Sequence, residues 1–312
     1  METMENQRQI QKIPAFLLAA AGVVMFSSKA IFVKKAYEYD IDTVSLLLIR
    51  MGIALPIYVV IAIVSSVLNK DNRLTKKDFI WLLLLGFLGY YLASFFDFHG
   101  LQFISASLER LILFIYPTLV LIISSIFLRK TITIQQKIAI VLTYIGVILA
   151  FYKYGNYNDN SNLVLGAGLI FASALSYAIY LVGSGNIIPR LGSVRFTSFA
   201  MIVSCVAVIL HYLLNHKQEV SILSYPPEVY KLGMAMAFIS TIIPSFLLGE
   251  AIKQLGAPNV AIVGSIGPIS TIILAAIFLG EHISYYQFAG TVVVIAGVLL
   301  IALNKKPKFL KK

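Results

Sequence analysis

Ten long apolar segments joined by short polar stretches constrain this chain more than any other feature of its sequence. About 20 apolar residues are enough to cross the hydrocarbon core of a bilayer as a helix. A backbone in hydrocarbon must satisfy its own hydrogen bonds, which leaves helices as the form for segments of this length. We therefore predict an all-α polytopic membrane protein with ten transmembrane helices at residues 13–33, 43–68, 79–98, 105–128, 134–152, 163–183, 195–214, 228–250, 258–279 and 284–303.

The composition excludes a soluble protein of this size. Only 12% of the residues are charged, whereas a soluble domain carries roughly a quarter. The net charge of +11 does not indicate a nucleic-acid partner, because most Lys and Arg lie in short loops between apolar segments. The single cysteine, Cys205, excludes an intrachain disulfide. We interpret the first apolar run as a membrane helix, because at about 21 residues it exceeds the usual apolar region of a signal peptide.

The distribution of Lys and Arg predicts the orientation of the helices. With a cytoplasmic N-terminus, the inner segments hold 16 Lys and Arg and the outer segments hold five. Positive residues concentrate on the cytoplasmic side of membrane proteins. We predict a multi-pass protein of the cytoplasmic (inner) membrane with both termini in the cytoplasm.

The second half of the chain repeats the first half at an offset of 151 residues. Pro117 aligns with Pro268, Gln136 with Gln287, and Gly146 with Gly297. Each copy contains five predicted helices, so the second copy begins on the opposite side of the membrane and the two repeats are inverted. Inverted repeats are common in secondary transporters, whose substrate site forms between the halves.

These observations divide the chain into five parts. We predict a cytoplasmic N-terminal segment at 1–12, a first five-helix repeat at 13–152 and an outer linker at 153–162. The second five-helix repeat follows at 163–303, and a basic cytoplasmic tail occupies 304–312.

The second repeat resembles the drug/metabolite transporter superfamily of the EamA type. The resemblance rests on a proline-bearing helix from Gly264 to Pro268, the turn Gly280-Glu281, and a closing helix with Gly290 and Gly297. The segment 106–150 is similar but has Arg129-Lys130 where many members have an acidic turn. The resemblance implies two EamA-like five-helix repeats and a carrier of amino acids, other metabolites or drugs.

In the family that the chain resembles, a cavity between the halves is formed by the third, fourth, eighth and ninth helices. Polar and aromatic residues at mid-membrane depth on these helices, and on the sixth, are therefore candidate substrate-binding residues. The alternative is that each of them packs against a neighbouring helix or faces lipid. The candidates are Tyr90, Ser94, Phe95, Tyr177, Ser240, Thr241, Ser245 and Ser265.

Ionisable residues inside the first half form a second candidate group. A charge within the membrane is costly and usually has a function. All of these residues fall in the predicted outer third of the bilayer, and their partners in the repeat are largely uncharged. We predict a gate or coupling site, with Glu109 as the main candidate for proton exchange; the alternative is a set of structural ion pairs near the interface. The group is Lys29, Arg50, Asp97, His99, Glu109 and Arg110.

Two prolines at equivalent positions of the repeat suggest hinges. Pro117 and Pro268 each remove a backbone hydrogen bond from a predicted helix and favour a kink. The kinks are either points of movement or inherited static bends.

The sequence contains no motif of an enzyme or a nucleotide-driven pump. We therefore predict a secondary transporter, not an enzyme, that exports a small amino-acid-like or drug-like metabolite by alternating access, with proton coupling as a further hypothesis. Uptake or exchange by the same fold is one alternative, and a membrane-embedded enzyme or lipid-handling protein is another. The predicted partners are a small-molecule substrate and the lipid bilayer, with no nucleic acid, cofactor or metal, and the sequence makes no prediction of oligomeric state.

Overall fold

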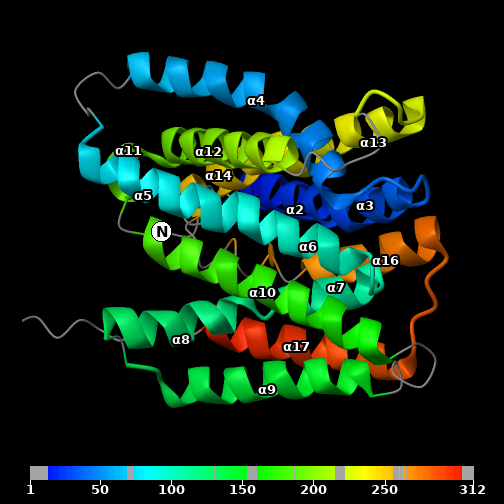
Figure 1. Cartoon of the computed structure of the whole chain (residues 1–312). Coiled ribbons are helices and arrows are strands. Elements are labelled where there is room, and N and C mark those ends of the chain that lie inside the picture. Colours follow the sequence, from blue (N-terminus) through cyan, green and yellow to red (C-terminus); the bar gives the residue numbers. More distant parts are fainter. Residues whose placement is uncertain are drawn as a thin grey trace, which may run out of the picture.

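The computed structural model describes residues 13–68, 74–129, 131–152, 160–185, 187–214, 222–255, 260, 263–264 and 266–303. The first half begins with a helix in two parts (Figure 1), and later helices are also subdivided. In chain order the elements are α2 (Ile13–Ser27), α3 (Lys29–Tyr37), α4 (Thr43–Leu68), α5 (Lys76–Gly86), η1 (Phe87–Leu92), α6 (Ala93–Leu101), α7 (Ala106–Leu113), α8 (Tyr116–Leu128) and α9 (Ile134–Phe151).

The second half has the same plan. Its elements are α10 (Asn160–Ser184), α11 (Ile188–Leu191), α12 (Ser193–Leu214), α13 (Pro227–Ala237), η3 (Phe238–Ile242), α14 (Ile243–Leu255), α16 (Ile266–Leu279) and α17 (Tyr285–Leu303). Eight helices within the described ranges are long and apolar enough to cross a membrane, and α16 and α17 supply two shorter apolar helices. The prediction of an all-α polytopic protein with ten helices in two five-helix repeats is confirmed.

The third helix of each half shows the repeat most closely. Adding 151 to the bounds of α5 gives 227–237, which are the bounds of α13. In both halves this α-helix passes into a π-helical segment, η1 or η3, that begins at equivalent residues, Phe87 and Phe238. The sequence predicted helices at 79–98 and 228–250 but did not indicate the π-segments. A π-segment widens the helix locally and often occurs at functional sites.

The glutamines that align in the repeat have the same structural role in both halves. Gln136 and the N-cap Thr133 exchange side-chain to backbone hydrogen bonds at the start of α9. Gln287 and Ser284 form the same reciprocal pair at the start of α17. Such a capping box satisfies two backbone N–H groups that the first turn of a helix leaves without partners.

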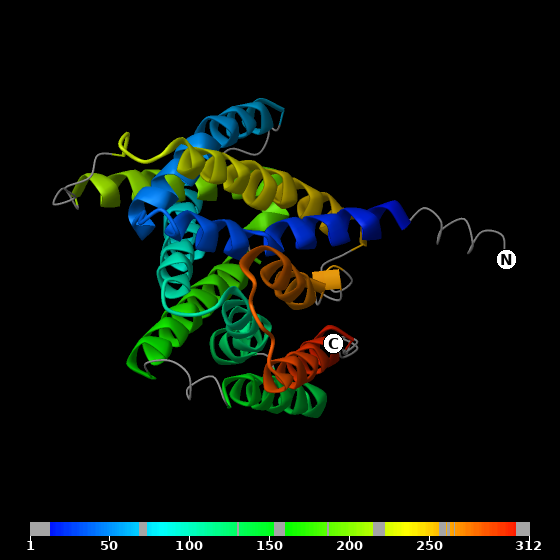
Figure 2. The ribbon, with the colours of Figure 1, turned by 90° about the vertical axis from the view of Figure 1, so that its right-hand side faces the viewer.

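The last helices of the two halves, α9 and α17, pack directly on each other and lie side by side in Figures 1 and 2. A Cβ atom on Gly290 would lie 2.5 Å from the carbonyl oxygen of Gly146, and one on Gly297 would lie 2.9 Å from that of Ala139. Gly290 precedes Gly297 in α17, whereas their neighbours Gly146 and Ala139 follow the reverse order in α9, so these equivalent helices run antiparallel. This is the relation that inverted repeats require.

The first helix of each half packs on the third and fourth helices of the other half (Figure 2). Thus α2 contacts α14 and α16, while α10 contacts α6, η1, α7 and α8. Ser173 Oγ on α10 donates to the carbonyl oxygen of Ala93, and Ser176 Oγ donates to that of Leu88. The two halves are therefore interleaved, and a movement of one half must rearrange these contacts.

Both hinge candidates lie in helices of the structure. Pro117 is the second residue of α8, directly after the break between α7 and α8. A proline in the first turn leaves no N–H without an acceptor, which makes this position favourable. Pro268 lies in α16. Whether the chain bends there during a transport cycle stays a prediction.

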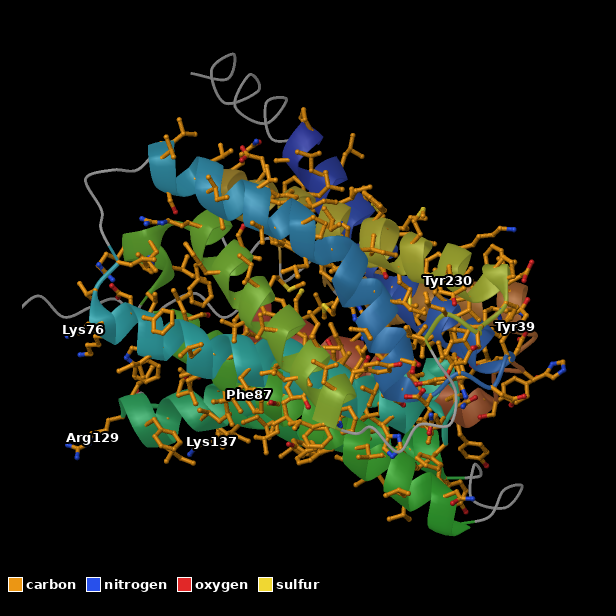
Figure 3. The ribbon with its side chains drawn as sticks, turned by 45° about the horizontal axis from the view of Figure 1, so that its top comes forward. Tyr39, Lys76, Phe87, Arg129, Lys137 and Tyr230 are labelled. Carbon is orange, nitrogen blue, oxygen red and sulfur yellow. The ribbon has the colours of Figure 1, made fainter. Side chains whose placement is uncertain are left out.

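The two ends of the bundle differ in their side chains (Figure 3). Lys76 and Arg129 lie at one end, whereas Tyr39 and Tyr230 lie at the other. The charge distribution predicts that the first is the cytoplasmic end, and we call it the inner end. We call the end with Tyr39 and Tyr230 the outer end.

Candidate functional site

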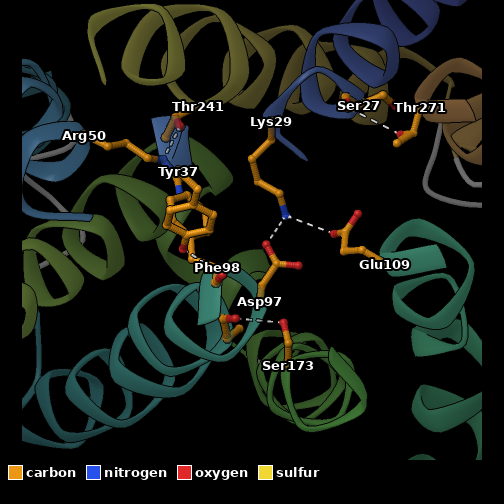
Figure 4. A network of polar contacts seen from close by, with 11 residues as sticks. Ser27, Lys29, Tyr37, Arg50, Asp97, Phe98, Glu109, Ser173, Thr241 and Thr271 are labelled. Carbon is orange, nitrogen blue, oxygen red and sulfur yellow. Dashed lines mark hydrogen bonds and ion pairs between the residues drawn. The ribbon is translucent and has the colours of Figure 1, made fainter. Parts of the chain in front are cut away.

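Three charged side chains form a cluster between the helices (Figure 4). Lys29 Nζ is 2.5 Å from Asp97 Oδ2 and 3.6 Å from Glu109 Oε1. The two carboxylate side chains are 2% and 0% exposed, and the lysine side chain is 15% exposed. We call Lys29, Asp97 and Glu109 the ion cluster.

Three different helices of the first half position the ion cluster. Lys29 is the first residue of α3, directly after the break in the first helix at Ser28. Asp97 lies in α6 and Glu109 in the first turn of α7. With all three groups ionised, the cluster has a net charge of −1, and Arg50 and Arg110 also interact electrostatically with Asp97 and Glu109 respectively. A proton on one carboxylate would make the cluster itself neutral.

Arg110 does not join the ion cluster but connects the two halves. Its Nη2 lies 3.5 Å from Ser27 Oγ, and Ser27 Oγ donates to the carbonyl oxygen of Gly267 on α16 at 3.1 Å. Thr271 Oγ1 donates to the carbonyl oxygen of Ser27 at 3.4 Å (Figure 4). A Cβ on Gly267 would lie 2.6 Å from Arg110 Nη2, so a glycine leaves space here for the guanidinium group.

Arg50 forms a separate buried contact between the halves. Its Nε donates to Thr241 Oγ1 on η3 at 2.8 Å, and its guanidinium carbon lies 5.2 Å from the centre of the Phe98 ring. Arg50 is only 5% exposed. A cation over an aromatic face is stabilised by the quadrupole of the ring. The predicted residues Arg50 and Thr241 are therefore brought together, a pairing that the sequence could not show.

We expect Thr241→Val to destabilise the protein by about 1.5–3 kcal/mol, because it removes the acceptor of a buried, charged donor. Thermal unfolding of the purified protein in detergent measures this effect. Ser240→Ala is the matched control, since Ser240 Oγ donates only within its own helix, to the carbonyl oxygen of Met236. Equal losses of stability in the two variants would show that the Arg50 contact has no special weight.

The π-segments place other candidate residues at the contact between the halves. Tyr90 on η1 shares a hydrogen bond of 3.0 Å with Tyr180 on α10. Tyr177 stacks on Tyr180 with ring centres 5.7 Å apart and meets the edge of Tyr116 at 5.3 Å. Of these four tyrosines, only Tyr90 and Tyr177 were predicted. Tyr180 could have been found in the sequence, since it is the repeat partner of Lys29.

The remaining predicted substrate-binding residues are dispersed. Ser245 Oγ lies 3.1 Å from the hydroxyl oxygen of the fully buried Tyr58, which was not predicted. Ser240 makes the intrahelical bond described above, and Ser94 is partly buried on α6. Ser265 lies outside the described residues. Their role in binding stays a prediction.

His99 lies in a group of aromatic side chains, not in the ion cluster. Its ring stacks on Phe95 at 5.9 Å and meets the edge of Phe103 at 5.4 Å. Phe95 also contacts His211 at 5.2 Å, and His211 Nδ1 is 2.8 Å from the hydroxyl oxygen of Tyr91. This arrangement favours packing for His99 and Phe95.

A cavity of about 510 Å³ lies at the outer end, away from the predicted substrate residues. It is lined by the turn between α3 and α4 and by the end of α6, including Lys34, Asp40 and Gln102. None of the predicted substrate-binding residues lines it. In the part of the chain that the structure describes, no group of three or more His, Cys, Asp and Glu side chains could hold a metal ion.

Comparisons with known proteins agree with this architecture. The model of the EamA-like transporter family matches residues 13–152 and 164–303. The uncharacterized transporter YcbK of Bacillus subtilis (strain 168) is 32% identical over 292 residues, which cover 92% of each chain. The uncharacterized transporter YyaM of the same organism is 26% identical over 252 residues, which cover 80% of this chain and 81% of YyaM. One solved crystal structure has the same fold, with a TM-score of 0.64, 13% identity, and coverage of 92% of this chain and 96% of its own.

Proposed function

Because the chain belongs to the EamA-like transporter family, we propose that it is a secondary carrier that exports a small amino-acid-like or drug-like metabolite. Transport occurs by alternating access to a site between the two halves. Both termini are cytoplasmic in this proposal, and the protein resides in the cytoplasmic membrane. Glu109 couples transport to protons.

The observation that carries the coupling proposal is the ion cluster. Two buried carboxylates share one ammonium group, and they come from different helices, α6 and α7. Glu109 is the less tightly paired of the two, at 3.6 Å from Lys29 Nζ against 2.5 Å for Asp97. A proton on Glu109 cancels the net charge of the cluster. It also weakens the attraction between α7 and α3.

Proton binding therefore favours a different arrangement of α7. When Glu109 is neutral, moving α7 away from Lys29 no longer separates opposite charges in a medium of low dielectric constant. When Glu109 is charged, the ion pair holds α7 against α3. A proton gradient can bias such an equilibrium, because each protonation state favours one of the two arrangements.

The site of transport in this proposal is the layer where the halves meet. Arg50, Thr241 and Tyr180 are buried there, Tyr90 is partly buried, and together they combine a cation, hydroxyl groups and aromatic rings. Such a set can bind a small polar or amphipathic molecule through a few directed hydrogen bonds and an apolar surface. The ion cluster lies beside this layer, through Asp97 and its neighbour Phe98 under the Arg50 guanidinium group.

We expect Glu109→Gln to abolish the pH dependence of transport and to leave exchange of substrate intact. Proteoliposomes are loaded with radiolabelled amino acids or a labelled lipophilic cation, after thermal-shift screening of these compounds against the purified protein. Efflux is then measured with and without a pH gradient. Glu228→Gln is the control, because Glu228 is 48% exposed in a surface pair with Lys231. If efflux by the Glu109→Gln variant responded fully to the pH gradient, Glu109 would not be the coupling residue.

Counterflow distinguishes a carrier from a membrane-embedded enzyme or a lipid-handling protein. A carrier exchanges labelled for unlabelled compound without changing it chemically. The direction of the pH gradient that accelerates efflux separates export from uptake.

A further inference from the structure

One carboxylate of the second half reaches across the outer end and binds the beginning of α7. Glu281 Oε1 accepts the backbone N–H of Ala106 at 2.7 Å. Glu281 Oε2 accepts the backbone N–H of Ser107 at 3.1 Å and its hydroxyl at 2.6 Å. A carboxylate at a helix N-terminus interacts favourably with the helix dipole and with N–H groups that lack intrahelical acceptors. We call this the outer contact.

The turn after α16 gives Glu281 this direction. Gly280 adopts a left-handed conformation with φ of +65°, and the Glu281 N–H returns to the carbonyl oxygen of Ala275 at 3.2 Å. Residues other than glycine rarely adopt such a φ. In the first half the aligned residues are Arg129-Lys130, so the repeat has no equivalent carboxylate at the inner end.

At the inner end, an ion pair connects the two halves. Arg190 on α11 contacts Asp78 in the first turn of α5 through Nη2 and Oδ1. Asp78 Oδ2 also accepts from the backbone N–H and hydroxyl of Thr75, which fixes the carboxylate in place. The repeat partners of Asp78 and Arg190 are Val229 and Tyr39, so this pair is likewise confined to one end. We call it the inner contact.

Both contacts act on helices that carry the ion cluster. Glu281 binds Ala106 and Ser107, within one turn of Glu109 on the same short helix. Asp78 lies in the first turn of the third helix, whose outer part, α6, carries Asp97. Opening the outer end would separate the turn after α16 from the beginning of α7, and Glu109 lies within one turn of that point. The outer contact therefore holds the helix that carries Glu109.

We propose that Glu281 forms the outer gate of the carrier by holding the beginning of α7 in place. The Asp78–Arg190 pair forms the inner gate. Each gate opens only while the other is closed. This inference rests on the proposed function, since it assigns the contacts that open and close during transport. The alternative is that Glu281 serves only as a cap for α7.

Hydrogen–deuterium exchange of the full-length protein in lipid nanodiscs tests this inference without a substrate. In Glu281→Ala we expect exchange to become about tenfold faster in α3 and α6, the equivalent of losing one charge-assisted hydrogen bond. Exchange in α5 and α11 should become slower, because opening the outer end closes the inner end. Arg190→Gln should produce the opposite pattern. Glu281→Gln should give a smaller effect of the same direction, and it replaces Glu281→Ala if that variant does not fold.

The control is Glu38→Gln at the same end, because Glu38 is 55% exposed and forms a surface pair with Lys35. The Glu38→Gln variant should leave hydrogen–deuterium exchange unchanged at both ends. Faster exchange confined to residues 106–108 would show that Glu281 is only a helix cap and would overturn the proposal. Faster exchange at both ends would indicate general loss of stability and would also overturn it. A protein that shows the opposed pattern but moves no labelled compound would refute the proposed function and leave the two contacts as conformational switches.

Discussion

Replacing Lys29 by methionine should destabilise the protein by about 3–5 kcal/mol, the cost of removing one partner from a buried ion pair. The variant leaves Asp97 and Glu109 in the interior without their shared cation, at exposed fractions of 2% and 0%. Thermal unfolding in detergent measures the loss.

Two further variants make this prediction specific. Lys35→Met should change stability by less than about 1 kcal/mol, because Lys35 and Glu38 form an exposed surface pair. Combining Lys29→Met with Asp97→Asn should recover much of the loss, since the interior then holds one carboxylate in place of two. If Lys29→Met cost no more than Lys35→Met, the ion cluster would not be the buried electrostatic centre of the protein.

Replacing Gly290 by alanine should separate α9 from α17 and destabilise the protein by about 1–3 kcal/mol, the range for overpacking a close contact. The added Cβ would lie 2.5 Å from the Gly146 carbonyl oxygen and 2.9 Å from both the Cβ and the backbone nitrogen of Ala150. None of these atoms can rotate away as the end of a long side chain can. Thermal unfolding and the yield of monodisperse protein measure the effect.

Gly168→Ala is the matched control for this prediction. Gly168 lies in α10, and nothing lies within 4 Å of the position of an added Cβ. Alanine is a better helix former than glycine, so the control should be neutral or stabilise by up to about 1 kcal/mol. A Gly290→Ala variant as stable as Gly168→Ala would mean that α9 and α17 are not in close contact.

Much of the fold follows from the sequence. The ten apolar segments predicted ten helices, because only helices satisfy the backbone over such lengths in hydrocarbon. The offset of 151 predicted the relation between halves, and it holds for the bounds of α5 and α13. The aligned glutamines marked the repeat, and the patterns Thr133-x-x-Gln136 and Ser284-x-x-Gln287 could also have predicted the capping boxes.

The candidate site was predictable only in part. Lys29, Asp97 and Glu109 stood out because charges inside a membrane need partners, and the structure brings these three together. The pairs Arg50–Thr241 and Tyr90–Tyr180 depend on π-segments, which arise from packing between helices and leave no periodic signal in the sequence. The reach of Glu281 to α7 spans more than 170 residues, and local sequence patterns cannot indicate such a contact.

The contacts that bear on function differ between the two halves. The packing glycines, the capping boxes and the π-segments occur in both halves and maintain the common fold. Among the described residues, the ion cluster, the outer contact and the inner contact each occur once. In the proposed carrier, this difference would allow a proton to act on one end and not on the other.

Simultaneous recording of substrate and proton movement tests whether Glu109 couples the two. Proteoliposomes carrying a pH-sensitive dye in the lumen and a labelled compound selected by thermal shift are prepared with the wild-type protein and with Glu109→Gln. We predict that the wild type moves protons when the compound is added, whereas the Glu109→Gln variant exchanges the compound without moving protons. Equal proton movement in both preparations would show that Glu109 does not couple transport to protons.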